Sequence, residues 1–164
     1  MIVDSLIEIP SGSKNKYEID KKLNRIRLDR VLYSSVSYPA EYGYIIDTLA
    51  DDGDALDILV LSSSATFPGC LVEARVLGYL DMIDKGQYDQ KVISVNEHDP
   101  RFEDIRSLDD VPNHIKREIK EFFKTYKDLQ DVEVKIGEFH GYEETVKLIE
   151  ECRQNYIKNQ KNIA

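Results

Sequence analysis

The stretch Asp51-Asp52-Gly53-Asp54-Ala55-Leu56-Asp57-Ile58-Leu59-Val60-Leu61 joins an acidic turn to a short apolar run. The continuous apolar residues 58–61 are typical of a strand that is buried on both of its faces. Residues 52–57 of the turn before them place three carboxylates around a glycine, and such a turn would lie at the mouth of a sheet. The stretch therefore predicts a sheet-based fold with an acidic site at one end of a core strand.

Other strands are predicted on both sides of this run. In residues 16–20 the apolar Tyr17 and Ile19 alternate with charged side chains, and residues 26 and 28 continue that pattern. A turn at Pro68-Gly69 precedes another long candidate. The strands expected besides residues 58–61 are residues 6–9, 16–20, 26–28, 71–80 and 91–95.

The apolar period changes in the last third of the chain. Residues 114–129 carry apolar side chains at helical spacing, and Pro112 and Asn113 stand where a helix would begin. A short strand at residues 132–136 and a second helix at residues 143–156 are expected to follow, with a fraying polar tail from Lys158. This order predicts an α+β, mainly β fold: a small barrel with helices packed outside, in a single domain over residues 1–164.

Composition excludes several classes of protein. The 164 residues carry a formal net charge of −9, which offers little attraction for nucleic acid. No apolar run approaches the roughly 20 residues of a membrane span. The N-terminal residues lack the basic and apolar regions of a secretory signal, so a cytoplasmic protein is expected. The cysteines, Cys70 and Cys152, form no CxxC pair, so neither a disulfide nor a structural zinc site is expected.

The acidic turn has two interpretations. Carboxylates this close repel one another unless a cation compensates, and oxygen ligands of this kind suit Mg²⁺. Asp and Gly are also the commonest residues of ordinary surface turns. An EF-hand is excluded, because a loop that starts at Asp52 would need Gly at position 57 and Glu at position 63, where Asp57 and Ser63 stand.

A second acidic segment precedes the expected strand at residues 91–95. Asp81, Asp84 and Asp89 flank Gly86, and in an extended chain Asp89 and Lys91 point to the same side. By itself this segment also fits a solvated hairpin loop. If both acidic segments met at one end of the barrel, they would supply enough oxygen ligands for two or three Mg²⁺ ions.

Basic and aromatic residues complete a possible anion site. Lys16 and Glu18 share one strand face, and Arg30 ends the next candidate strand. Tyrosines crowd residues 38–44, and Tyr126 and Lys127 close the long helix, although core packing alone would also explain the tyrosines. No phosphate-binding GxxxxGK[ST] loop, HExxH helix or GxSxG elbow is present. Metal-activated water therefore remains the visible route to chemistry.

In this order, these pieces resemble the family I soluble inorganic pyrophosphatases. The resemblance runs from about Leu6 to Ile136, and its joint order and spacing are specific although each motif alone is weak. The motifs that carry it are Ile7-Glu8-Ile9-Pro10, Lys16-Tyr17-Glu18, Leu28-Asp29-Arg30, Tyr38-Pro39 with Tyr42-Gly43-Tyr44, Asp52-Gly53-Asp54 with Asp57, Asp84 with Asp89 and Lys91, and Phe122-Phe123 with Tyr126-Lys127.

The resemblance implies a role for each matching residue, in Mg²⁺-dependent hydrolysis of pyrophosphate to two orthophosphates. The implied direct ligands of several Mg²⁺ ions are Asp52, Asp57, Asp84 and Asp89. The implied phosphate ligands are Lys16, Arg30, Tyr42, Lys91, Tyr126 and Lys127. Asp54 would be the general base, with Tyr42 also in the catalytic set, and the outer supporting residues would be Glu8, Glu18 and Tyr38.

The resemblance also implies a five-stranded, OB-like β-barrel with two flanking C-terminal helices, assembled as a homohexamer. The chain departs from the family pattern at Glu41, where Asn is usual, at Ala55, where Pro is usual, and at Lys85, where an acidic residue is common. None of these departures removes an implied ligand, so activity with altered metal affinity is expected. A nucleic-acid-binding OB module and an inactive scaffold of the same fold are the alternatives. The first would need a basic groove and the second a lost ligand.

Overall fold

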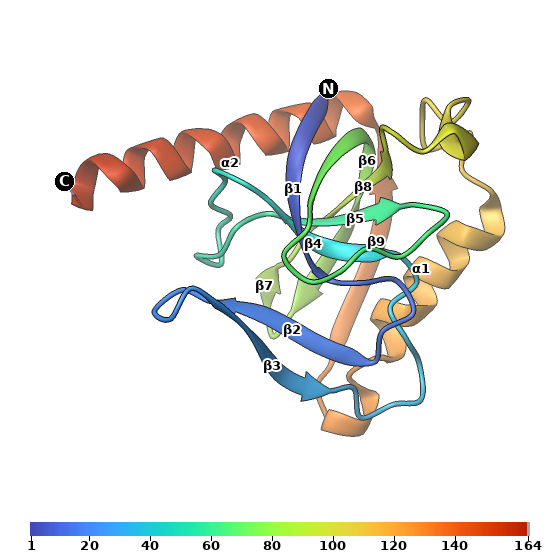
Figure 1. The fold of residues 1–164 in the computed structure, drawn as a ribbon, viewed down its shortest axis with the longest axis horizontal. Helices are drawn as coiled ribbons and strands as arrows, with labels where there is room; N and C mark the ends of the chain where they lie inside the picture. Colours follow the sequence, from blue (N-terminus) through green and yellow to red (C-terminus); the bar gives the residue numbers. More distant parts are fainter. Residues whose placement is uncertain (164) are drawn as a thin grey trace.

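The computed structural model describes residues 1–163, and its central feature is a closed ring of five strands (Figure 1). Each strand is hydrogen-bonded to the next, and the pairing of β1 with β6 closes the ring. In order around the ring, the strands are β1 (Ile2–Ile9), β4 (Glu41–Ile45), β5 (Asp57–Leu61), β8 (Lys91–Asn96) and β6 (Leu71–Asp84). The predicted five-stranded barrel is therefore confirmed by the pairing.

Strand β5 is buried on both faces, as its continuous apolar run predicted. Leu59 and Leu61 pack in one core with Phe122 and Phe123 of helix α1 (Asn113–Thr125). On the opposite face, residues 58 and 60 join a second core with Ile149 and Cys152 of helix α2 (Tyr142–Ile163). Both flanking helices therefore press on the strand that begins at the acidic turn.

Strand β6 is longer than predicted and extends to Asp84. It also pairs with β7 (Gln87–Tyr88) and with β9 (Val134–His140). The sharp turn after it is made by Lys85 and Gly86, both with positive φ. Asp81 and Asp84 thus lie within a strand and not in the loop that the sequence suggested, and Asp81 packs against Gly137 of β9.

The β2 (Asn15–Asp20) and β3 (Arg25–Val31) hairpin forms a separate two-stranded sheet below the barrel (Figure 1). The predicted strands are present, but Ile26 and Leu28, which continue the alternating apolar pattern, are not buried. Their exposed fractions are 46% and 50%, because the hairpin stands outside the ring. Tyr17 and Ile19 are half-buried.

The helices begin as predicted but end elsewhere. Helix α1 starts after Pro112 and stops at Thr125, so the expected continuation to Leu129 is wrong and that side chain is 66% exposed. A short 3-10 turn (Asp128–Gln130) follows and ends at Asp131 in the left-handed region, which redirects the chain into β9. A second 3-10 turn (Pro100–Phe102) follows β8.

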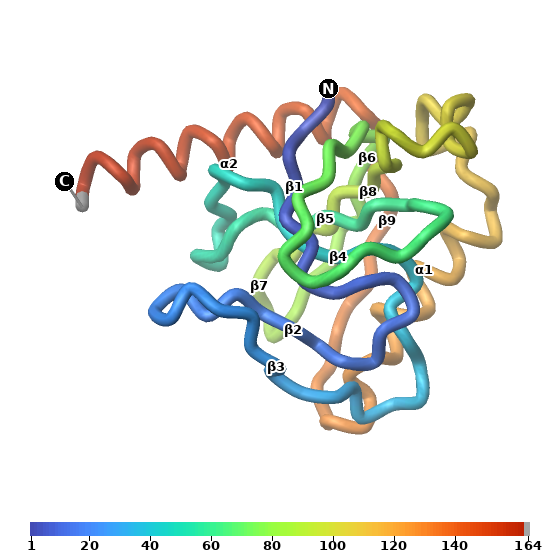
Figure 2. Tube along the Cα trace, viewed as in Figure 1, coloured from blue at the N-terminus to red at the C-terminus, as the bar shows by residue number. Residues whose placement is uncertain are grey.

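Helix α2 (Tyr142–Ile163) continues well past the predicted end at residue 156 and includes residues 158–163. Lys, Gln and Asn are compatible with helix, and the first turns are already packed on the barrel, so the helix propagates. Figure 2 shows this helix reaching past the rest of the molecule. Among residues 1–163, no helix has the length and apolarity needed to cross a membrane. Both cysteines are free, as expected.

Candidate active site

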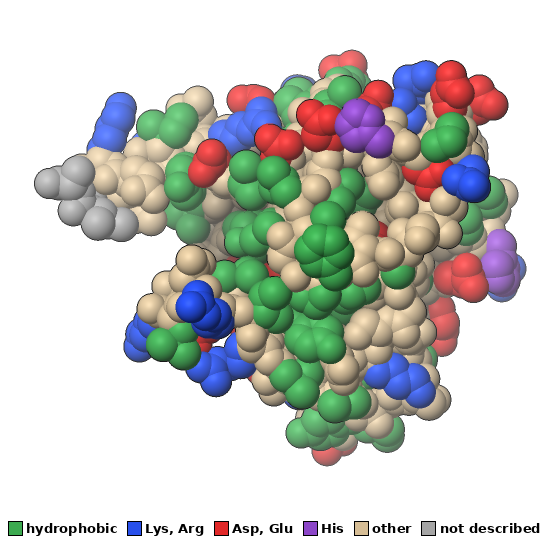
Figure 3. Space-filling view, in the orientation of Figure 1, with side chains coloured by type: hydrophobic (Ala, Val, Ile, Leu, Met, Phe, Trp, Pro, Cys, Tyr) green, Lys and Arg blue, Asp and Glu red, His purple; other side chains and the backbone are tan. Residues whose placement is uncertain are grey.

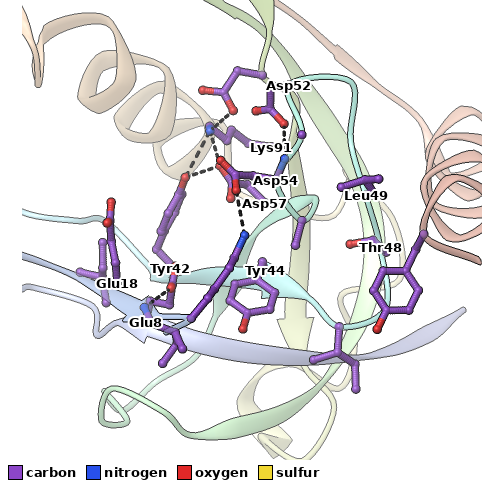
Figure 4. A pocket seen from close by; sticks show the side chains of 18 of the residues that line it. Glu8, Glu18, Tyr42, Tyr44, Thr48, Leu49, Asp52, Asp54, Asp57 and Lys91 are labelled. Carbon is purple, nitrogen blue, oxygen red and sulfur yellow. Dashed lines mark hydrogen bonds and ion pairs between the residues drawn. The ribbon is translucent and has the colours of Figure 1, made fainter. Parts of the chain in front are cut away.

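The two acidic segments meet where β5 and β8 begin. These strands are parallel, and Asp57 is the register partner of Lys91. The Lys91 Nζ lies 2.5 Å from Asp57 Oδ2 and 2.5 Å from Asp89 Oδ1, so the expected common side of residues 89 and 91 is confirmed. The Tyr42 hydroxyl donates to the same Asp57 oxygen at 2.5 Å. One buried ammonium thus joins carboxylates from both segments (Figure 4).

The charges in this cluster depend strongly on one another. Burial alone would lower the pKa of Lys91, but Asp57 and Asp89 more than offset it and raise that pKa above its ordinary value. Burial raises the pKa of Asp89, and the charges of Asp57 and Asp52 raise it further against the opposing effect of Lys91. Burial, together with Asp57 and Asp89, also raises the pKa of Tyr42 well above its usual range, so its hydroxyl stays protonated.

The acidic turn presents its other two carboxylates toward solvent. Gly53 takes φ +90°, and the Asp54 amide donates to Asp52 Oδ1 at 3.0 Å. The Asp54 side chain is 75% exposed, and its Oδ1 lies 3.1 Å from Lys21 Nζ at the hairpin tip. The Asp54 carboxylate is therefore exposed at the mouth of the pocket.

The end of α1 supplies a third group of side chains. Tyr126 is buried, and Lys127 forms an ion pair with Asp84 across to β6. The second oxygen of that carboxylate, Asp84 Oδ1, is buried and has no hydrogen-bond partner within the described residues. Burial raises the pKa of Tyr126 above its usual range, and the negative charges of Asp89 and Asp84 raise it further. The early end of α1 thus directs two predicted phosphate ligands toward the carboxylates.

The β2–β3 hairpin carries the two other basic side chains predicted to bind phosphate. Lys16 and Arg30 are register partners on β2 and β3. Lys16 pairs with Glu18, confirming their shared face, and Arg30 Nη1 lies 2.5 Å from Asp29 Oδ2. The Arg30 Nε is buried without a partner in the described chain, so this guanidinium retains an unused donor.

Glu8 on β1 and Tyr38 in the loop before β4 lie beside the site. Burial raises the pKa of Glu8 to about 7, although its Oε1 accepts a 2.9 Å hydrogen bond from the Ile19 amide. Tyr38 is buried, with its ring centroid 5.2 Å from that of Tyr42 and 4.7 Å from that of Phe122. Burial raises the pKa of Tyr38 above its usual range.

A cavity of about 820 Å³ gathers most of the predicted residues (Figure 4). Arg30, Tyr38 and Asp84 are not part of its lining, and Asp84 reaches it only through Lys127. The predicted site residues that line the cavity are Glu8, Lys16, Glu18, Tyr42, Asp52, Asp54, Asp57, Asp89, Lys91, Tyr126 and Lys127.

Sequence reasoning missed several residues of the cavity wall. Lys21 lies on the hairpin tip, and Tyr156, Asn159 and Gln160 come from α2. Lys21 could have been suspected from its nearness to Glu18 in the sequence. The α2 residues carry no such signal, because only tertiary packing brings that helix next to the acidic turn.

The donor chemistry fits hard divalent cations. Within residues 1–163, no group of three or more candidate ligands is already arranged around one point. The carboxylates are instead paired with Lys91 and Lys127, and Asp84 Oδ1 remains unsatisfied. Half-buried carboxylates, one of which (Asp89) has a raised pKa, in a cavity that also holds lysines are typical of a site that binds metal together with an anion.

The departures from the family pattern lie outside the centre of this cluster. Lys85 is exposed in the turn after β6, with φ +49°. Glu41 is buried at the start of β4 and binds two loops through its carboxylate. Ala55 lines the cavity beside the acidic turn.

Comparison with protein families identifies the chain. The inorganic pyrophosphatase family model matches residues 5–157. The chain belongs to the inorganic pyrophosphatase family. A relative from Geobacillus stearothermophilus, named inorganic pyrophosphatase, is 54% identical over 155 residues, which are 94% of each chain. One from Synechocystis is 49% identical, over 94% of this chain and 92% of that one.

Solved inorganic pyrophosphatases share the whole architecture. The Thermus thermophilus structure has a TM-score of 0.92 at 44% identity and covers 94% of this chain and 91% of that one. The Helicobacter pylori structure has a TM-score of 0.91 at 39% identity, over 94% and 93% of the two chains. Family membership implies use of a divalent metal. The sequence resemblance and the expected OB-like fold are thus confirmed.

Proposed function

We propose that the chain hydrolyses inorganic pyrophosphate to two orthophosphates by direct attack of metal-activated water, without a covalent intermediate. Its family membership supports the reaction. The observation that carries the assignment of residues is the buried Lys91, held between Asp57 and Asp89 on the floor of the cavity. A cation fixed among carboxylates can serve both the metals and the phosphates of one substrate.

The metal ligands are Asp52, Asp57, Asp84 and Asp89, and we propose Mg²⁺ as the ion they bind. Carboxylate oxygens are the ligands that Mg²⁺ prefers, and it keeps several waters besides them. When bound, the metal ions neutralise phosphate charge and lower the pKa of the attacking water toward neutrality. Glu8 and Glu18 line the same cavity as Asp57, and we propose that they support the site from its outer shell (Figure 4).

Asp54 accepts the proton of the attacking water. Its carboxylate is exposed at the cavity mouth and, within residues 1–163, forms an ion pair only with the exposed Lys21, a contact that costs little to break. The attacking oxygen forms a bond to one phosphorus, and the bridging oxygen leaves with the other phosphate. Tyr42 remains protonated and holds Asp57 in place through its hydroxyl.

The phosphates are bound by donors from three parts of the fold. Lys16 and Arg30 come from the hairpin, Lys91 from β8, and Tyr126 and Lys127 from the end of α1. Donors fixed in advance around the substrate stabilise the charge that develops on the leaving phosphate. Tyr38 packs against Tyr42 and keeps that wall of the site rigid.

The test is phosphate release from pyrophosphate, measured with and without Mg²⁺ and across other divalent metals. Hydrolysis is expected only with a divalent metal. Absence of hydrolysis with every divalent metal would refute the proposed function, and hydrolysis in the presence of a strong chelator would refute its metal dependence.

We also propose that the chain forms a homo-oligomer, with a hexamer favoured. Apolar side chains gather across the face shown in Figure 3. Exposed fractions of 65% for Phe67, 56% for Leu71 and 50% for Leu28 leave a large apolar area uncovered on the isolated chain. Light scattering during size-exclusion chromatography will give the mass of the assembly, and a monomer at all concentrations would contradict the proposal.

A further inference from the structure

The hairpin that carries Lys16, Glu18 and Arg30 is not part of the barrel. Among residues 1–163 its two strands pair only with one another, so no strand ladder of the described chain joins them to the ring (Figure 1). The position of these side chains over the site must therefore be set by loops and by side-chain contacts. The molecule needs a fixed attachment for the hairpin, since phosphate-binding groups act only when held in place.

Glu41 is the most buried side chain that makes such an attachment. It lies at the start of β4, is 1% exposed and does not line the active-site cavity. Its Oε1 accepts the Ser11 amide at 2.8 Å, and its Oε2 accepts the Thr66 amide at 3.1 Å and the Thr66 hydroxyl. No salt bridge in the described part of the chain involves Glu41, so these donors alone balance its carboxylate.

The Ser11 side of this contact continues into both strands of the hairpin. The Gly12 amide donates to the Tyr38 carbonyl at 2.8 Å, and the Tyr38 amide donates to Ser13 at 3.0 Å. The Leu32 amide then donates to the Lys14 carbonyl at 2.8 Å, where the two strands leave the loops. A shift of Ser11 would thus move the base of the hairpin as a unit.

The Thr66 side supports the same hairpin from another direction. The loop that contains Thr66 is fixed to β1 by the Gly69 amide, which donates to Ile7 at 2.7 Å. At Gly69 the backbone comes so close to β3 that an added Cβ would lie 3.3 Å from Ile26 Cδ1. One carboxylate therefore joins the base of the hairpin to the loop against which the hairpin rests.

We propose that Glu41 is a positioning residue that holds the β2–β3 hairpin, and with it Lys16 and Arg30, in register over the phosphate site. This inference rests on the proposed function. The carboxylate acts through Ser11 and Thr66 and touches neither metal nor substrate. It accepts hydrogen bonds on both of its oxygens, which an amide of the same shape is unable to do.

Glu41→Gln tests the proposal, because glutamine has one acceptor oxygen and one NH₂ group in place of two acceptors. Either the Ser11 amide or the Thr66 amide then faces a donor and loses its partner. We expect the KM for magnesium pyrophosphate to rise by about tenfold while kcat changes much less. In the metal-free protein, hydrogen exchange at the Ser11 and Thr66 amides should accelerate by a similar factor.

Ser5→Ala is the matched control. Ser5 is also fully buried, and its hydroxyl donates to the Val72 carbonyl at 2.9 Å, but this contact lies within the barrel. The variant Ser5→Ala should lower the melting temperature without changing KM. The positioning role is refuted if Glu41→Gln, like Ser5→Ala, lowers the melting temperature but changes neither KM nor the exchange rates of the Ser11 and Thr66 amides. A wild-type chain without pyrophosphatase activity would instead refute the proposed function, and amide exchange would still report whether Glu41 holds the loops.

Discussion

Asp57 and Lys91 face one another at the first positions of the paired parallel strands β5 and β8, with Asp57 Oδ2 2.5 Å from Lys91 Nζ. Thirty-four positions separate them in the sequence. Because Lys91 is also 2.5 Å from Asp89, its buried charge compensates both carboxylates when no metal is bound. This contact is therefore both a structural element and part of the proposed site.

Lys91→Met should destabilise the metal-free protein, since it leaves two carboxylates near one another without their cation. We expect a loss of about 3–5 kcal/mol in the free energy of unfolding, measured with denaturant, and a large fall in kcat/KM. Added Mg²⁺ should restore part of the lost stability. The control is Lys120→Met, which breaks a pair with the exposed Glu138 and should cost no more than about 1 kcal/mol. Equal losses in the two variants would contradict the assigned role of Lys91.

Asp54→Asn should slow catalysis with little effect on folding. Loss of a general base typically lowers kcat by about 10²–10⁴-fold, whereas a carboxylate that is 75% exposed contributes little to stability. Steady-state kinetics and thermal unfolding will separate the two effects. Asp51→Asn is the control, because Asp51 is an exposed neighbour in the same turn with no proposed role. A variant Asp54→Asn with near-normal kcat would rule out this residue as the base.

The raised pKa of Glu8 predicts that the stability of the metal-free protein depends on pH. Folding raises the pKa of Glu8 from 4.5 to about 7 through burial, so the native state favours the protonated acid. Its stabilising contribution is full below pH 4.5 and is lost as the pH rises through 7. Glu8→Gln should flatten this part of the stability profile, measured by denaturant unfolding in chelator. Glu133→Gln, at an exposed position, should not change it, and an unchanged profile in Glu8→Gln would contradict the prediction.

Divalent metal should stabilise the folded chain through the proposed ligands. A ligand that binds only the native state adds about 2.7 kcal/mol at one hundred times its Kd, so the melting temperature should rise with Mg²⁺ concentration. Asp84→Asn should reduce this rise, because the Asp84 carboxylate has a buried oxygen that no described residue satisfies. Asp109→Asn changes a carboxylate outside the site cavity and should leave the rise unchanged. Equal metal responses in both variants would exclude Asp84 as a ligand.

The mainly β class, the buried strand at residues 58–61 and the family could all be predicted from the order of the residues. These predictions rest on local signals, because an apolar run, a glycine turn and the spacing of charged side chains depend only on neighbouring residues. The same local signals led to errors where tertiary contacts decide. Leu28 alternates like a core residue yet is exposed on a hairpin outside the ring, and Leu129 fits a helix that in fact ends at Thr125.

Long-range contacts in the folded chain determine which residues share the site and what holds them in place. They bring Asp57 to Lys91 through a parallel strand pairing, Lys127 to Asp84 through the end of α1, and α2 to the wall of the cavity. They also make Glu41, otherwise an unexplained departure, a buried link between two loops. Such contacts join residues far apart in the chain, and their energies depend on burial and geometry, which the order of residues alone does not contain.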